Sequence, residues 1–202
     1  MKYNTTAKLY YNHLLHTLET YAQTQNIAIN YKKLKVTYSN MLYRTESIDT
    51  QKDANLYRAI FVFSLVKVHP ELTPKQIDEW IELYTHSKAF EKKYKAIDPF
   101  SKKVQEHTYK QSLISQKSTR MMDWTYLYKK GTNEFFITFS RCGVYQLAIK
   151  ENLQDYVPCL CKIEHRILEL QQGKIYQNQS LASGGFCCDY HVVKREGNNS
   201  NN

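Results

Sequence analysis

Apolar and aromatic positions recur at helical spacing through the first 120 residues of the chain. The predicted helices cover about residues 7–25, 31–43, 54–69 and 74–86. The third of them is apolar on most sides, which predicts a central place in the helical layer. Thr73 and Pro74 form a strong start signal for the fourth, a cap residue followed by proline at the first helical position. Residues 87–120 predict one or two amphipathic helices and a connection.

The pattern changes at about Met122, where β-branched and aromatic residues become dense. The predicted strands cover about residues 124–130, 134–141, 174–181 and 186–194. A helix opened by Pro158, capped by Asp155 or a neighbour and closed by Gly173, separates the two strand pairs. Asp53 is the predicted cap of the helix that begins at Ala54.

These patterns predict an α+β fold: an N-terminal helical layer packed on a small antiparallel sheet, formed by two C-terminal β-hairpins with an intervening helix. We expect a single domain over residues 1–195. It divides into a helical half, 1–120, and a hairpin-helix-hairpin half, 121–195. The polar residues 196–202 predict a disordered tail.

Composition and charge narrow the function classes. The chain has 202 residues, is 42% hydrophobic and carries a net charge of +9, but its lysines are spread out and interleaved with acids. With no zinc-finger spacing and no RNP-like motif, nucleic acid is not the favoured partner. No apolar run is long enough for a membrane span and no signal peptide is evident, so we expect a cytoplasmic protein. A small-molecule substrate or ligand is the expected partner, and the sequence leaves the oligomeric state open.

Three of the five cysteines fall where predicted elements begin or end: Cys142 after a strand, Cys161 in a helix opening, and Cys188 after two glycines. Glu164 lies one helical turn beyond Cys161, and Asp189 directly follows Cys188. Element ends allow side chains from different elements to converge. We therefore predict one pocket that holds two or three thiols and two carboxylates. Cys161, Glu164, His165 and Leu168 share a predicted helix face.

Each of these residues also has a plain structural interpretation. A reduced cysteine is often a small apolar filler, and Cys159 and Cys187 fit that interpretation best. Gly184 and Gly185 also suit a turn that requires positive φ. The cysteine spacings, C-x16-C, C-x-C, C-x25-C and an adjacent pair, match no standard zinc pattern. No metal and no cofactor are expected.

Three segments of the C-terminal third carry a resemblance to a known family. They are Arg141-Cys142-Gly143, Pro158-Cys-Leu-Cys161-Lys-Ile-Glu164 and Ser180-Leu-Ala-Ser-Gly-Gly-Phe-Cys-Cys-Asp189. Their order and spacing over about residues 120–193 resemble the L-2-amino-thiazoline-4-carboxylic acid hydrolase family, with weaker similarity upstream. Two positions depart from the family pattern. Glu164 stands where an aspartate is usual, and Ser180 stands for a threonine.

The resemblance implies an enzyme that opens a small cyclic isothiourea or amidine, converting L-2-amino-thiazoline-4-carboxylate to a carbamoyl-cysteine. The class is a hydrolase acting on non-peptide carbon–nitrogen bonds. The catalytic residues it implies are Cys188, Asp189, Glu164, Cys161 and Cys142. The substrate-binding residues it implies are Arg141, His165 and Gly185, with Arg141 or Lys162 pairing with the substrate carboxylate. The alternative is a non-catalytic domain that holds a small molecule in the same pocket.

Overall fold

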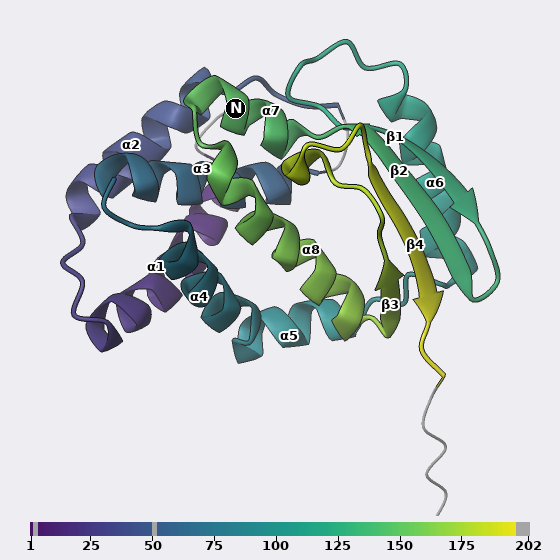
Figure 1. Cartoon of the computed structure of the whole chain (residues 1–202), viewed down its shortest axis with the longest axis horizontal. Coiled ribbons are helices and arrows are strands. Elements are labelled where there is room, and N and C mark those ends of the chain that lie inside the picture. Colours follow the sequence, from purple (N-terminus) through teal and green to yellow (C-terminus); the bar gives the residue numbers. More distant parts are fainter. Residues whose placement is uncertain (2–3, 50–51, 197–202) are drawn as a thin grey trace, which may run out of the picture.

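The computed structural model describes residue 1, residues 4–49 and residues 52–196. Its helices and strands follow the predicted α+β order, with α1 to α4 at one side and the sheet, together with α6, at the other (Figure 1). The predicted tail falls almost entirely outside the described residues, which end at Glu196. The predicted domain limits stay a prediction, although buried residues of both halves form one continuous hydrophobic cluster.

The helical half contains α1 to α6. Their bounds are α1 Thr5–Thr24, α2 Tyr31–Arg44, α3 Asp53–Val68, α4 Pro74–Thr85, α5 Lys88–Lys95 and α6 Lys102–Ser115. Helix α3 is buried on nearly all sides and packs against α1, α2 and α7, which confirms its predicted central place. Helix α4 begins with the predicted cap: Thr73, directly before Pro74, and Gln76, in the first turn, form a reciprocal capping box.

The C-terminal half contains the sheet and two further helices. Their bounds are β1 Thr125–Lys130, β2 Glu134–Arg141, α7 Gly143–Glu151, α8 Val157–Leu170, β3 Gly173–Tyr176 and β4 Cys188–Lys194, with 3-10 turns at Gln154–Tyr156 and Leu181–Ser183. The strands form one antiparallel sheet in the order β1-β2-β4-β3. Helix α8 lies between the sheet and the helical half (Figure 1).

Strand alternation gives the sheet two different faces. The inner face, toward the helices, carries Phe135, Ile137 and Phe139 of β2 opposite Val192, Tyr190 and Cys188 of β4. The outer face is more open, and Leu127 on it is 62% exposed. Helix α6 covers the edge of β1, where the Ser115 hydroxyl both accepts from the backbone N–H of Tyr126 and donates to its carbonyl.

Three predicted helix ends differ from the structure. Asp53 is the first residue of α3, and Lys52 holds the cap position without a side-chain cap. Helix α8 begins at Val157 after a 3-10 turn, so Asp155 caps nothing, and it ends at Leu170. Gly173 instead opens β3, where a Cβ would lie 2.9 Å from the Val192 side chain and 3.0 Å from the Leu168 carbonyl. Close packing of helix on strand therefore explains this glycine.

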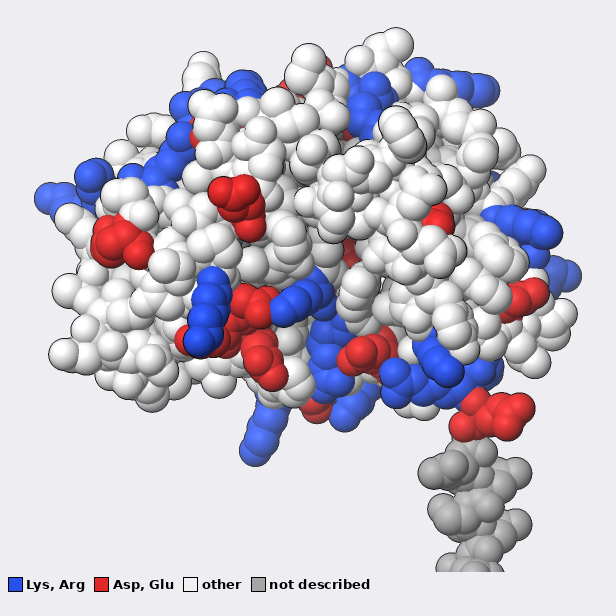
Figure 2. All heavy atoms as spheres, in the orientation of Figure 1, with Lys and Arg blue, Asp and Glu red and all other residues white. Residues whose placement is uncertain are grey.

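Charged side chains of both signs share the surface. Figure 2 shows Lys and Arg interleaved with Asp and Glu, most densely over α4, α5 and α8. Ion pairs account for part of this pattern, including Arg166–Glu91 at 2.9 Å and Lys95–Glu91 at 3.1 Å. Within the described ranges, no helix combines the length and apolar character that a membrane span requires.

Candidate functional site

A cavity of about 130 Å³ lies between the inner face of the sheet and helices α3, α7 and α8. Most of its wall is apolar, including Trp124, Ile137, Phe139, Leu160, Leu168 and Tyr190. The polar groups in the wall include three thiols, one carboxylate, and a lysine, an asparagine and an arginine from the start of α3. The Tyr190 hydroxyl and the Trp124 indole N–H belong to residues of the same wall. An apolar hollow with few convergent polar groups is the usual form of a small-molecule site.

The three thiols are Cys142, Cys161 and Cys188, and they reach the cavity from three elements. Cys142 caps α7 directly after β2, Cys161 lies in the first turns of α8, and Cys188 is the first residue of β4. The β2–β4 register places Phe139 opposite Cys188, so the end of one strand meets the start of the other. The predicted convergence of thiols from separate elements is present in the structure.

Burial holds two of these thiols in the protonated form. It raises the pKa of Cys142 to about 11, against the opposing effect of the Tyr145 and Val144 backbone N–H groups and the Trp124 side chain. Burial, with further contributions from the neighbouring thiols and Glu164, raises the pKa of Cys161 to about 12. Because the thiolate is the nucleophilic form, neither residue suits nucleophilic attack at neutral pH.

These raised pKa values predict a loss of stability in alkali. An unfolded thiol has a pKa near 8.5, so above about pH 9 the unfolded chain releases protons that folded Cys161 retains. The free energy of unfolding should then fall with a slope of up to ~1.4 kcal/mol per pH unit for each such thiol. Urea denaturation between pH 8 and about pH 10 tests this. Cys161→Ala should give a shallower slope than wild type, and parallel slopes would contradict the assignment.

Cys188 is held by hydrogen bonds to the turn that precedes β4. The backbone N–H of Leu181 donates to its sulfur at 3.3 Å, and the Ser180 hydroxyl lies 3.9 Å away. The turn before it fixes this arrangement. Gly184 has a φ of +81°, and a Cβ on Gly185 would lie 2.9 Å from the Ser180 carbonyl. Gly185 is therefore required by the turn and is not among the residues lining the cavity.

Glu164 provides the cavity's carboxylate from α8, one turn beyond Cys161. It is half-buried, and within the described part of the chain it has neither a hydrogen bond nor an ion pair. Its neighbour His165 does not line the cavity; the His165 ring contacts the Tyr190 ring edge-on at 5.6 Å and lines a separate surface hollow. Of the predicted helix face, Cys161, Glu164 and Leu168 line the cavity and His165 does not.

Asp189 lies on the outer side of β4 and does not line the cavity. Its carboxylate accepts hydrogen bonds from the backbone N–H groups of Asn178, at 3.0 Å, and Gln179, at 2.6 Å. Burial would raise the pKa of Asp189, but these hydrogen bonds outweigh it and hold the pKa below its usual range. The carboxylate therefore ties the β3–β4 connection to the strand.

Removing that anchor should loosen the connection locally. Asp189→Ala leaves the Asn178 and Gln179 amides without their acceptor, so we expect faster hydrogen exchange at these two amides. Asp189→Asn keeps an acceptor oxygen and should preserve most of the protection. The amide of Tyr126 in β1 serves as an internal reference. Unchanged exchange at residues 178 and 179 in Asp189→Ala would contradict the anchoring role.

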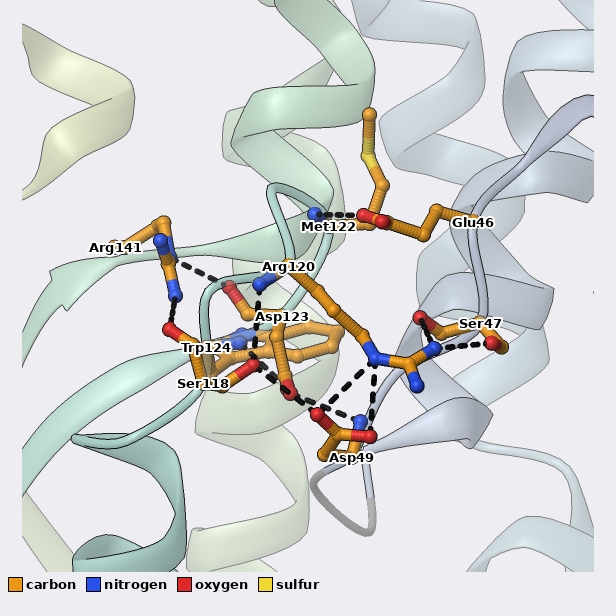
Figure 3. Close-up of polar contacts among 9 residues, drawn as sticks. All are labelled: Glu46, Ser47, Asp49, Ser118, Arg120, Met122, Asp123, Trp124 and Arg141. Carbon is orange, nitrogen blue, oxygen red and sulfur yellow. Dashed lines mark hydrogen bonds and ion pairs between the residues drawn. The ribbon is translucent and has the colours of Figure 1, made fainter.

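Arg141 does not line the cavity either; its guanidinium binds the loop between α6 and β1 (Figure 3). It donates to the backbone carbonyls of Asp123 at 3.2 Å and Ser118 at 2.8 Å. Lys162 pairs with Asp78 on the surface at 2.5 Å. Both cations expected to meet a substrate carboxylate are therefore engaged elsewhere.

The loop held by Arg141 also fixes one wall of the cavity. Buried Asp123 accepts from the backbone N–H of Trp124, a cavity residue, and from that of Asp49, in the segment that leads to α3. Arg120 forms an ion pair with Asp49 at 3.0 Å, so two connections far apart in sequence are joined (Figure 3). This cluster positions the start of α3 against β1.

Sequence reasoning missed three polar residues that line the cavity: Lys52, Asn55 and Arg58. They follow one another at about one-turn spacing at the start of α3. The sequence did contain a signal, because Arg58 interrupts the apolar run from Leu56 to Val66. In the structure Arg58 is only 1% exposed. A charge buried inside an apolar helix rarely occurs without a purpose.

No group of three or more His, Cys, Asp or Glu residues suited to hold a metal ion is found among the described residues. The five cysteines are free thiols. Cys159 is a buried one that contacts the Pro74 carbonyl at 3.3 Å and packs α8 on α4.

Fold and cavity together define an α+β protein with a thiol- and carboxylate-lined hollow of small-molecule size. The family model for L-2-amino-thiazoline-4-carboxylic acid hydrolase matches residues 54–192, which is well over half of the chain. The match includes every residue that lines the cavity except Lys52. The chain belongs to this family, as the resemblance predicted. The family name indicates a hydrolase. Comparisons with curated proteins and with solved structures gave no match.

Proposed function

We propose that the protein hydrolyses a small cyclic isothiourea or amidine. The reaction that the family implies is the conversion of L-2-amino-thiazoline-4-carboxylate to a carbamoyl-cysteine. The observation that carries this proposal is that Cys188 and Glu164, a carboxylate without an ion pair among the described residues, line the same largely apolar cavity. A nucleophile beside a proton-transfer group is what ring opening at an amidine-like carbon needs.

In the proposed first step, Glu164 takes the thiol proton of Cys188 and the sulfur bonds to the ring carbon between sulfur and nitrogen. The substrate enters as the amidinium, so its ring nitrogen already carries one proton and takes the second from Glu164. The ring carbon–nitrogen bond then breaks to release an amine, and the exocyclic nitrogen forms a double bond to the same carbon. In the second step a water molecule adds to the same carbon while Glu164 accepts its proton. The bond to Cys188 then breaks and its sulfur regains the proton, so the net change is the addition of one water.

Cys142 and Cys161 take a different part in this scheme. Because burial raises both pKa values, they stay neutral thiols and form a polarisable wall beside the reacting carbon. Asp189 supports the connection before Cys188 without touching substrate. Arg141 fixes the loop that carries Trp124. We further propose a small molecule as partner, rather than nucleic acid or membrane, and a cytoplasmic setting, where thiols stay reduced.

Incubation of purified protein with the thiazoline tests the proposal. We expect a product heavier by one water, with a new amine group and no new thiol, because the carbon–nitrogen bond breaks. Recovery of unchanged thiazoline at stoichiometric protein would refute hydrolysis. A new thiol in the product would instead show that the carbon–sulfur bond breaks.

The neutral state of two cavity thiols also favours one other function, a domain that binds a small molecule without cleaving it. Saturable binding of the thiazoline with complete recovery of the ligand would support that function over hydrolysis.

A further inference from the structure

The start of α3 presents a polar strip to the cavity, formed by Lys52, Asn55 and Arg58. The strip contains two cations, and the apolar wall of the sheet's inner face lies nearby. Lys52 extends over that face, with its ammonium 5.4 Å from the centre of the Phe139 ring and 5.6 Å from that of Tyr126. These contacts hold the ammonium beside the cavity without neutralising it.

Arg58 is the buried member of the strip. Its guanidinium donates to the Asn55 side-chain oxygen at 2.9 Å, to the Tyr84 hydroxyl at 3.4 Å and to the Tyr94 hydroxyl. All three acceptors are neutral groups. A guanidinium has five N–H donors, so these contacts leave two available.

Neither cation of the strip has a carboxylate within ion-pair distance among the described residues. Buried charges in proteins are normally paired, because an unpaired one is costly to desolvate. Burial would lower the pKa of Arg58, but Tyr84, Tyr94 and, more weakly, Glu164 outweigh it and keep the group charged. The influence of Glu164 also indicates that the strip and the α8 carboxylate face the same space.

We propose that the polar strip of α3 is a carboxylate-binding subsite and that Arg58 and Lys52 select small ligands bearing a carboxylate. Such a ligand would neutralise the buried charge that the fold leaves unpaired and fill the free guanidinium donors. Its cationic, amidine-like end would lie toward Glu164, so the cavity suits a small molecule with one anionic and one cationic end. The inference rests on the proposed function only for the identity of that second end.

A matched ligand pair tests the subsite without disturbing the protein. Thiazolidine-4-carboxylate and thiazolidine-4-carboxamide share a ring that lacks the cleavable amidine and differ in charge. Calorimetry on the full chain should show the carboxylate bound at least about tenfold more tightly than the carboxamide. Equal affinities, or binding of neither ligand, would overturn the inference.

Variants test whether the polar strip causes the preference for the carboxylate over the carboxamide. Lys52→Gln, at a partly exposed position, should reduce the preference several-fold, and Arg58→Gln should abolish it. Lys75→Gln removes the same charge from a residue of α4 that does not line the cavity, and should leave the preference unchanged. If Arg58→Gln does not fold, the ligand pair and Lys52→Gln still decide the matter. Preference unaltered by Lys52→Gln and by a folded Arg58→Gln would overturn the assignment.

Failure of this inference and failure of the proposed function give different results. A carboxylate preference without turnover of the thiazoline would refute hydrolysis and leave the subsite standing. Turnover of the thiazoline together with equal binding of the two thiazolidines would refute the subsite and leave hydrolysis standing.

Discussion

Glu164→Gln should lower kcat by about 10²–10⁴-fold, the usual contribution of a positioned acid–base group. Glutamine has nearly the same shape as glutamate but cannot carry the proton between Cys188, the leaving nitrogen and water. The carboxylate makes no hydrogen bond or ion pair with any described residue, so its replacement should cost the fold little. The affinity for a carboxylate ligand should persist, since the strip on α3 is intact.

Glu169→Gln is the matched control for that variant. It makes the same chemical change on the same helix, at a residue that pairs with Arg166 outside the cavity. Its kcat should equal that of wild type, and thermal unfolding should show that both variants are folded. A Glu164→Gln protein with wild-type kcat would remove Glu164 from the mechanism.

Cys188→Ser should lower kcat by about 10² or more, because a hydroxyl is a far weaker nucleophile than a thiol at neutral pH. The substitution keeps a small polar group beside the Leu181 N–H, which donates to the sulfur at 3.3 Å in the wild type. The loss should therefore appear in kcat and not in stability.

The adjacent thiol, Cys187, provides a control for the Cys188→Ser variant. Cys187 does not line the cavity and lies 3.9 Å from the Gln179 side-chain oxygen. Cys187→Ser should retain wild-type kcat. Equal activity of the two serine variants would show that Cys188 forms no bond with substrate.

Much of the fold could be predicted from the sequence because its signals are local. Helical periodicity and the Thr73-Pro74 start identified the helices, and the β-rich segments after Met122 identified the strands. The meeting of the three cavity thiols could also be anticipated, since element ends converge in a small sheet. The caps predicted at Asp53 and Asp155 were wrong, because each helix start has several possible cap residues and tertiary packing selects among them.

The placement of individual site residues depended on information that local patterns lack. Adjacent strand residues point to opposite faces, so Cys188 and Asp189 were unable to share the cavity once β4 began at Cys188. Arg141 binds backbone carbonyls of a loop that no sequence motif marks. Arg58 lies about 130 positions before Cys188 in the chain, and only the packing of α3 brings the two into one cavity wall.

The most direct test of ring opening in this cavity follows the ring carbon itself. The thiazoline, labelled with carbon-13 between its sulfur and nitrogen, is mixed with wild-type protein and observed by NMR. If the cavity opens the ring, the amidine resonance should be replaced by that of a carbamoyl carbon, whereas Glu164→Gln should leave the amidine resonance in place. An amidine resonance that persists with folded wild-type protein would contradict the central claim that this cavity opens the ring.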